Sequence, residues 1–408
     1  MKRFNKLFCF MAVFVTVIAA FCTVSFAQDF SNWSPKANMV EGAYACGSGY
    51  INDKIYIFGG YNSSQKVIGK LQMYNSDSDT WTEKASMPTP RLNMDIAEIN
   101  GKIYTIGGTL GVWNQLTNVN EVYDAATDTW EAKTSMPVAL SACASAVFDN
   151  KIYVFGGYKS NNSDQNSLYV YDTISDTWTI QSSMPTARRN CKAVVANNLI
   201  YVIGGWNNAS TPYSTVEAYD PVTDKWTTVG SMTEAKIAVA ALNIDGDMYV
   251  FGGLINANSG TNKIEKYNYE LNSWNVVGTL PDNRGEMGIA YIKNSVYIIG
   301  GRDSNSTVYN TIYSSEVPVI PTDPEEPPVI TGNKAILEIV MTNGTIKEYD
   351  LAAKEIENFL KWYDNRSAGT DKAYISIIKR SNVKPFVSRN EYLQFKEIYS
   401  FEVKEYKE

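Results

Sequence analysis

Basic side chains at matching positions of a repeating pattern are the first residues of this sequence that could carry chemistry. Each lies four positions after a recurring Met or Leu, and the four are Arg91, Arg188, Lys236 and Arg284. In a protein with a net charge of -7, such a set would form a positive ring that attracts an anionic group. A second interpretation stays open, in which these side chains form ion pairs that hold neighbouring repeat units in register, with Glu41, Glu234, Asp282 or Glu286 as partners.

Aromatic side chains form the second candidate group. Tyr61, Tyr158 and Trp206 each follow a Gly-Gly pair directly, and Trp113 and Arg302 lie in the corresponding stretches of other repeats. Asn and Gln surround them, a combination that suits sugar rings, which offer apolar faces for stacking and hydroxyls for hydrogen bonds. Asn, Ser and Gly are also ordinary loop residues. The predicted ligand-binding residues are therefore Tyr61, Arg91, Trp113, Tyr158, Arg188, Trp206, Lys236, Arg284 and Arg302.

The absence of histidine limits the reactions that the chain could catalyse. The sequence contains no His, which excludes Ser-His-Asp and Cys-His nucleophiles, His-ligated metal centres and imidazole acid-base catalysis. The acidic net charge argues against a nucleic-acid partner. Cys46, Cys143 and Cys191 each lie seven residues after a Met, as expected for small buried apolar side chains. We predict no cofactor and no metal site, and we assign no catalytic residue.

The Gly-Gly pairs raise the question of a phosphate-binding loop. They follow apolar, strand-like runs with spacings of 48 or 49 residues, and they end at Gly60, Gly108, Gly157, Gly205, Gly253 and Gly301. A phosphate loop occurs once or twice, whereas six copies at one period indicate a repeat architecture. The glycines are therefore predicted to bend the chain where a side chain would crowd a neighbouring strand.

Tryptophans mark the other end of each repeat. Five of them lie seven residues after a Tyr, but the sixth Gly-Gly unit has Tyr313 with no Trp after it. The missing Trp stands near the N-terminus, where Trp33 to Met39 matches Trp81 to Met87. The N-terminal strand is thus expected to complete the last unit and close a ring. The structural Trp set is Trp33, Trp81, Trp130, Trp178, Trp226 and Trp274.

Each unit has the pattern of four short strands. In the third unit these are Ser141 to Phe148, Ile152 to Phe155, Ser167 to Asp172 and the segment around Trp178. Since successive strands run antiparallel, the short turns should share one face, and the long loops after Gly-Gly should share the other. The Asp two residues before each Trp, such as Asp128, is expected to cap a hairpin turn, with calcium binding as the alternative.

Together these motifs resemble kelch repeats, and the resemblance covers residues 29 to 317. It implies an all-β six-bladed kelch β-propeller in which Tyr and Trp pack between blades. Kelch-type enzymes include galactose oxidase, whose copper site needs histidines that this chain lacks. They also include extracytoplasmic sialic acid epimerases, which need acid-base groups and an anion-binding arginine. In this chain, Arg91, Arg188 or Arg284 would have to bind the anion, and Glu286 would have to act as the acid-base group.

The two ends of the chain differ from the repeats. Residues 1–27 have a basic start, an apolar run and small residues before Gln28, which is typical of a cleaved signal peptide, although the run is also long enough for an uncleaved anchor. Prolines are frequent in 318–332, which predicts an extended linker. Residues 333–408 are richer in charge and are expected to form a small α+β domain. The propeller is assigned to residues 28–317.

The sequence favours a secreted or cell-surface kelch propeller of the bacterial type that binds a carbohydrate or protein partner on its long-loop face. We expect a monomer, with the C-terminal domain a candidate for surface association. Two alternatives remain, a sugar enzyme like the sialic acid epimerases and a structural component of a surface assembly.

Overall fold

The computed structural model describes residues 30, 32–111, 115–207, 211–256, 259–303, 307–317, 334–341, 346–367, 374–379, 389–394 and 398–406. The predicted signal peptide, the predicted linker and Trp113 lie outside these ranges. Within them, no helix has the length and apolar character needed to cross a membrane.

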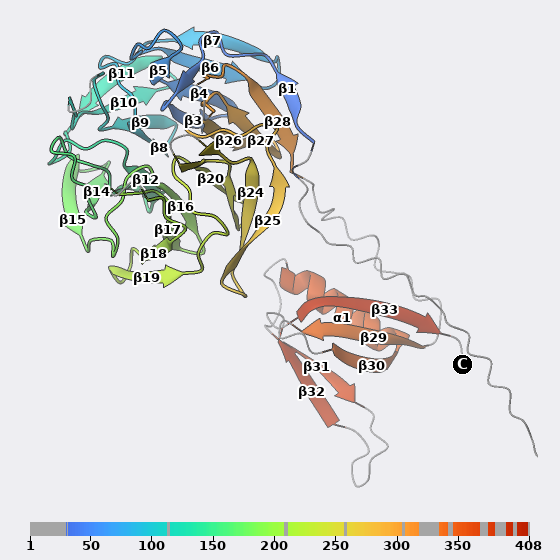
Figure 1. Ribbon diagram of the computed structural model, residues 1–408. Helices are drawn as coiled ribbons and strands as arrows, with labels where there is room; N and C mark the ends of the chain where they lie inside the picture. The colour runs from blue at the N-terminus through green and yellow to red at the C-terminus, as the bar shows by residue number, and fades with distance from the viewer. Residues whose placement is uncertain are drawn as a thin grey trace, which may run out of the picture.

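Six four-stranded antiparallel sheets surround a central axis as the blades of a propeller (Figure 1). Blade 1 contains, from the axis outward, β3 (Gly47–Ile51), β4 (Lys54–Phe58), β6 (Leu71–Asn75) and β7 (Thr80–Lys84). Blade 2 contains β8 (Asp95–Ile99), β9 (Lys102–Ile106), β10 (Asn120–Asp124) and β11 (Thr129–Lys133). Blade 3 contains β12 (Ala144–Phe148), β13 (Lys151–Phe155), β14 (Leu168–Asp172) and β15 (Thr177–Gln181).

The remaining blades repeat this plan. Blade 4 contains β16 (Lys192–Ala196), β17 (Leu199–Ile203), β18 (Val216–Asp220) and β19 (Lys225–Val229). Blade 5 contains β20 (Ala240–Ile244), β21 (Asp247–Phe251), β24 (Lys263–Asn268) and β25 (Ser273–Thr279). Blade 6 contains β26 (Gly288–Ile292), β27 (Ser295–Ile299), β28 (Ile312–Glu316) and, paired with β28, the N-terminal strand β1 (Ser34–Lys36). The innermost strands contact one another around the axis, including β26 and β3.

The strand sequences explain this packing. Ile152 to Phe155 in β13 are all buried because both faces of each sheet pack against neighbouring blades, whereas the outermost strand β15 is mostly exposed. The turn between β12 and β13 uses Asp149 and Asn150 with φ values of 48° and 58°, as tight hairpins require. The innermost strand begins at Ala144, later than the predicted Ser141, because Ala142 takes a positive φ and leaves the strand geometry.

The second glycine of each Gly-Gly pair joins one blade to the next. Gly157 has a φ of 84°, and a Cβ there would lie 2.8 Å from the carbonyl oxygen of Ser141. Its N–H donates to the carbonyl oxygen of Arg188, which leads into the following blade, at 2.9 Å. The same bond occurs at all six pairs, to the carbonyls of Arg91, Leu140, Arg188, Lys236, Arg284 and Ala43. These N–H groups are therefore occupied by backbone carbonyls, as an architectural role of the glycines requires.

A second link lies at the outer rim, where the residue after an outermost strand is held by the next blade. Ala85, which follows β7, donates its N–H to Asp128 Oδ1 at 2.9 Å and accepts from Trp130 Nε1 at 2.7 Å. Asp128 Oδ1 also accepts from the Tyr123 hydroxyl at 2.8 Å. The same three bonds recur around Ala37, Thr134, Ser182 and Gly230, with Asn272 replacing Asp in the last case. We call this arrangement the rim clamp.

The rim clamp corrects the role predicted for these aspartates. Asp128 occupies a turn position with a φ of 55°, but its carboxylate reaches across to the preceding blade. The turn is capped instead by Asp124, whose Oδ1 accepts from the Ala126 N–H at 2.9 Å. The backbone N–H of Ala85 and the hydroxyl of Tyr123 both bond to Oδ1 of Asp128, so this oxygen serves the contact between blades.

Residues after 333 form separate elements. β29 (Lys334–Met341) lies between β30 (Ile346–Ala352) and β33 (Ile398–Tyr406) in one sheet, β31 (Tyr374–Lys379) pairs with β32 (Arg389–Gln394), and α1 spans Ala353–Ser367. Leu337 and Ile339 of β29 and Ile356 and Phe359 of α1 are fully buried. Strands and a helix thus occur together in the described residues of this segment, while an α+β domain with these boundaries stays a prediction.

If β1 holds the ring closed, deleting residues 28–39 should lower the melting temperature and cause aggregation, since the edge of β28 becomes exposed. The deletion also removes the bond from Trp33 Nε1 to the Thr279 carbonyl, at 2.8 Å, and the rim clamp around Ala37. Thermal unfolding and light scattering measure both effects. Val40→Ser, at an exposed position just beyond the deletion, is the control. A deleted protein as stable and soluble as the parent would contradict the closure.

The rim clamp predicts different effects for two substitutions at Asp128. Asp128→Ala should cost about 1–3 kcal/mol of unfolding free energy, because two donors lose their acceptor. Asp128→Asn should cost less, since Asn272 makes the equivalent bonds in blade 5. Urea unfolding at neutral pH measures both, with Glu131→Gln, in an exposed ion pair, as the control.

Acid titration tests the charge of the same clamp. The Ala85 N–H and the Tyr123 hydroxyl hold the pKa of Asp128 below its usual value. Stability from this carboxylate is then fully present above the unfolded pKa of about 4 and is lost as pH falls through the lower folded pKa. The stability difference between the parent and Asp128→Asn should therefore shrink below about pH 4. A difference that grows on acidification would contradict the assignment.

Candidate functional site

Two adjoining cavities open on the long-loop face and share Asn93 and Tyr158. The smaller, of about 160 Å³, is also lined by Tyr44, Tyr61, Leu92, Thr109 and Gly111. The larger, of about 390 Å³, is also lined by Ala142, Asn162, Arg189, Asn190, Trp206, Ile237, Leu254, Glu286 and Arg302. We call the two together the funnel. It leads to a third cavity, of about 100 Å³, inside the central channel.

A ring of six residues, one from each blade, surrounds the mouth of the channel. All six have φ between 51° and 55°, and they are Ala45, Asn93, Ala142, Asn190, Ala238 and Glu286. In blades 2 to 6, the N–H of the ring residue donates to the carbonyl oxygen of the ring residue in the preceding blade, at 2.9 to 3.0 Å. Around this mouth ring, Ala in blades 1, 3 and 5 alternates with a polar residue, Asn or Glu, in blades 2, 4 and 6.

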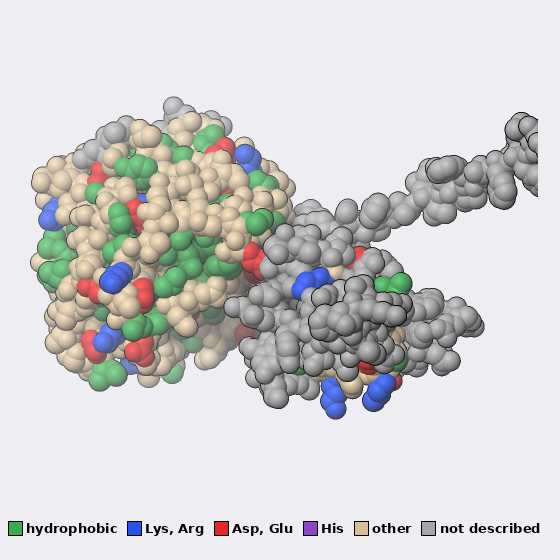
Figure 2. All heavy atoms as spheres, turned by 90° about the horizontal axis from the view of Figure 1, so that it is seen from below, with side chains coloured by type: hydrophobic (Ala, Val, Ile, Leu, Met, Phe, Trp, Pro, Cys, Tyr) green, Lys and Arg blue, Asp and Glu red, His purple; other side chains and the backbone are tan. Residues whose placement is uncertain are grey.

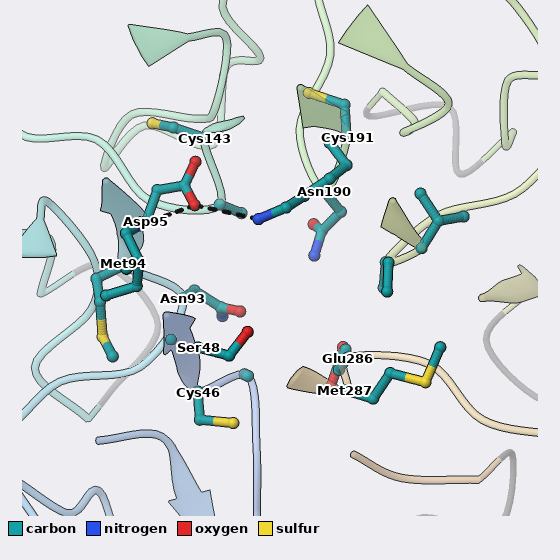
Figure 3. Close-up of a pocket in the computed structure, with 18 of the residues that line it drawn as sticks. Cys46, Ser48, Asn93, Met94, Asp95, Cys143, Asn190, Cys191, Glu286 and Met287 are labelled. Atoms are coloured by element: carbon teal, nitrogen blue, oxygen red, sulfur yellow. Dashed lines mark hydrogen bonds and ion pairs between the residues drawn. The ribbon is translucent and has the colours of Figure 1, made fainter. Parts of the chain in front are cut away.

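The mouth ring is the main part of the site that the sequence analysis missed. Figure 3 shows Asn93 and Asn190 directed toward the middle of the cavity, whereas the sulfur atoms of Cys143 and Cys191 point away from it. The signal was available, because each ring residue lies two positions after the basic residue or its equivalent. Ala, Asn and Glu share no chemical type, however, and positive φ is uncommon for Ala and Glu.

An ion pair links two blades along one side of the channel, below the mouth ring. Lys192 of blade 4 lies 3.5 Å, Nζ to Oδ1, from Asp95 of blade 2, and Figure 3 labels Asp95, from which the dashed line of this pair starts. The equivalent residue of the blade between them is Ala144, whose small side chain leaves room for the lysine to pass. The pair connects two blades that are not neighbours.

Two arginines hold the aromatic walls of the funnel. The Arg189 guanidinium lies between the rings of Tyr158 and Trp206, 4.8 and 5.5 Å from their centroids. It pairs with Asp164 at 3.2 Å and donates to Asn162 Oδ1 at 2.7 Å. Contacts of this kind between a cation and a ring fix the side chains of the wall.

Arg302 does the same on the opposite wall. It donates to both carboxylate oxygens of Glu286, at 2.7 and 3.1 Å, and this hydrogen bonding raises the pKa of Arg302 above its usual value. Its guanidinium lies 5.2 Å from the ring centroid of Tyr44, which in turn meets Tyr61 edge-on at 5.6 Å. The funnel thus unites Tyr61, Tyr158, Trp206 and Arg302 of the predicted set.

The predicted positive ring of Arg91, Arg188, Lys236 and Arg284 is wrong. All four side chains are fully buried, because each forms an ion pair inside the protein. Arg91 pairs with Glu121 at 2.7 Å, Arg188 with Glu217 at 3.1 Å, Lys236 with Glu265 at 2.5 Å, and Arg284 with Asp282. The four therefore form internal ion pairs, as the second interpretation expected, but their acidic partners lie on the blade or connection to which the basic residue itself leads.

Three of these partners differ from those considered in the sequence analysis. Glu121, Glu217 and Glu265 lie 29 or 30 residues after their basic residue, on the third strand of the same blade. In blade 3 the corresponding pair is apolar, Leu140 with Tyr169. A correlation at this spacing was therefore visible in the sequence. Asp282, the partner of Arg284, was the one correctly anticipated.

The three cysteines beside the channel are unpaired. Burial raises the pKa of both Cys46 and Cys191 to about 12 and raises that of Cys143 as well. These values suit inert apolar side chains better than nucleophiles.

Comparison with known families gives two overlapping matches. Residues 18–254 match the family model described as Attractin/LZTR1 beta-propeller, and residues 238–281 match that of the Kelch motif. Among solved structures, that of YjhT is similar with a TM-score of 0.59 and 18% identity, covering 68% of this chain and 96% of that one. This likeness concerns the fold.

Curated relatives match over short segments. Beta-scruin of Limulus polyphemus is 30% identical over 21% of this chain and 9% of its own length. An uncharacterized protein of Clostridium acetobutylicum is 35% identical over 18% of this chain and 19% of its own. The human Kelch repeat and BTB domain-containing protein 12 is 30% identical over 21% and 15%. The matches thus span less than a fifth of each of these relatives.

Exchanging a charged pair for an apolar one tests the corrected role of the basic residues. Arg188→Leu alone should cost about 3–5 kcal/mol, because Glu217 is left buried and unpaired. The double variant Arg188→Leu/Glu217→Tyr copies Leu140 and Tyr169 and should recover most of this loss. Urea unfolding measures both, with Lys133→Ala in an exposed pair as the control. A single variant as stable as the double would contradict the pairing.

Proposed function

Because the chain belongs to the Attractin/LZTR1 β-propeller family and carries kelch repeats, we propose that it is a secreted or cell-surface binding module whose ligand enters the funnel. Kelch propellers are typically protein-binding modules, and the aromatic and amide lining of this funnel also suits a carbohydrate. The ligand is therefore proposed to be a protein or carbohydrate, with no reaction catalysed on it.

The observation that carries this proposal is that the aromatic side chains of the funnel are preorganised. Tyr44, Tyr158 and Trp206 are held by guanidinium groups that are themselves fixed by carboxylates. A ligand that stacks on Tyr44 or Trp206, which are partly exposed, orders few side chains as it binds, which favours affinity. Loops on a rigid scaffold are also the usual location of binding residues.

The sugar-enzyme alternative is less well supported by the same geometry. The arginines that it invoked, Arg91, Arg188 and Arg284, are buried. Glu286 does lie in the funnel, but it is bonded to Arg302 through both oxygens. A general acid or base must exchange a proton with its substrate, and both oxygens of Glu286 are already occupied by Arg302.

The proposal extends to the rest of the chain. Residues 1–27 direct secretion and residues 28–317 form the propeller, which β1 closes. Residues 318–332 act as a spacer before the α+β domain of 333–408, which associates with a surface. On the face that Figure 2 shows, Lys and Arg side chains of the propeller lie among Asp and Glu side chains, which fits a monomer without a large patch of one charge.

Truncating one wall of the funnel tests the proposal. Trp206→Ala should weaken ligand binding by about 1–3 kcal/mol, because an aromatic anchor is lost. A glycan array and a pull-down with the mature protein would identify the ligand, and calorimetry would then give affinities. Val222→Ala, at an exposed turn of the opposite face, is the control. If Val222→Ala weakens binding and Trp206→Ala does not, the ligand site is on the other face.

A further inference from the structure

We infer that the ligand of the funnel is an uncharged oligosaccharide with at least two sugar rings, an inference that rests on the proposed function of the funnel as a ligand site. It goes beyond that function by selecting carbohydrate over protein and neutral over charged sugars.

The charges that line the funnel and the channel cancel in pairs. The cationic lining residues are Arg189, Arg302 and Lys192, and they pair with Asp164, Glu286 and Asp95 respectively. Within the described residues, these pairs account for every charged group that lines the three cavities. An acidic ligand would have to displace a carboxylate from an arginine, and a basic ligand would have to displace a guanidinium. Each exchange leaves a desolvated charge without its partner, which is unfavourable.

The neutral polar groups of the funnel match hydroxyl groups. Tyr158 is 3% exposed, and its hydroxyl finds no hydrogen-bond partner among the described residues. A buried hydroxyl without a partner is unfavourable, and a small shift of Tyr158 toward the cavities that it lines would let a ligand hydroxyl supply the missing bond. Asn93 lines all three cavities and offers both a donor and an acceptor. Amide and phenol groups of this kind can bond to a sugar hydroxyl as donor or acceptor without a charge.

The two cavities provide two places for sugar rings. Tyr44 and Tyr61 line the smaller cavity, and Trp206 lines the larger one. Asn93 and Tyr158 belong to both and therefore lie where the rings would be linked. A ligand that used both aromatic walls would place one ring in each cavity and the linkage near Asn93 and Tyr158.

The first experiment compares neutral and acidic sugars of matched length. Short cello-, xylo-, manno-, malto- and chito-oligosaccharides are titrated into the full-length mature protein by calorimetry, each beside a sialylated or uronic-acid-containing counterpart. At least one neutral series should bind, more tightly as a disaccharide than as a monosaccharide, and at least tenfold more tightly than its acidic counterpart. Preference for an acidic counterpart would overturn the inference, and so would failure of every neutral series.

Two variants test whether the Tyr158 hydroxyl and the Glu286 carboxylate cause the sugar affinity and the preference for neutral sugars. Tyr158→Phe should weaken binding of the neutral sugar by roughly 3- to 10-fold without lowering protein stability, because its hydroxyl has no protein partner. Glu286→Gln should leave Arg302 with an uncompensated charge and raise the affinity for the acidic counterpart. Unchanged sugar affinity in Tyr158→Phe, or unchanged charge preference in Glu286→Gln, would overturn the inference.

The outcome for the proposed function is separate. A peptide ligand whose binding is lost in Trp206→Ala, with no sugar bound, would overturn the carbohydrate inference and leave the funnel as the binding site. Sugar binding that persists in both Trp206→Ala and Tyr158→Phe would place the site elsewhere and overturn both.

Discussion

The hydrogen bonding between adjacent blades is the constraint on which the rest of this structure depends. A single chain connection leads from each blade to the next, so the relative position of two sheets must be set by contacts across their seam. Three such contacts recur at increasing distance from the axis: the backbone bonds of the mouth ring, the bond from the second glycine of Gly-Gly, and the rim clamp. In each of these contacts, at least one of the two blades contributes a backbone N–H or carbonyl group. The side chains of those residues can therefore vary without loss of the contact.

These contacts also determine where the functional groups lie. The Gly157 N–H fixes the carbonyl of Arg188, and the Arg188 side chain is anchored by Glu217 inside blade 4. Two residues later the chain reaches Asn190 of the mouth ring, and Arg189 between them turns into the funnel. A buried charge pair is weak evidence for stability, but here it fixes the segment that carries both a wall residue and a ring residue. The basic residues thus shape the site without touching the ligand.

The sequence predicted the repeat better than the site, for reasons that individual residues make clear. Gly-Gly and Trp have few substitutes at their positions, so their period indicated six blades and pointed to Trp33. Tyr61, Tyr158 and Trp206 were predictable because loop position and residue type agreed. The burial of Arg91 was not predictable, because an arginine in a connection between blades can point either to solvent or inward. Its direction here depends on Glu121, which lies on another strand. The rim clamp could not be predicted because an aspartate at the position of Asp128 also fits an ordinary turn. The mouth ring could not be predicted because its residues share a backbone conformation and no side-chain type. The signal peptide and the linker stay predictions.

The ion pair between Lys192 and Asp95 makes the channel unequal on its two sides, although the blades around it repeat. The pair joins blades 2 and 4 and passes over blade 3, where Ala144 is the equivalent residue. A ligand group that reaches below the mouth ring from the funnel therefore meets a salt bridge on the side of blade 3. Its orientation about the propeller axis can then be selected, although the fold itself is close to sixfold.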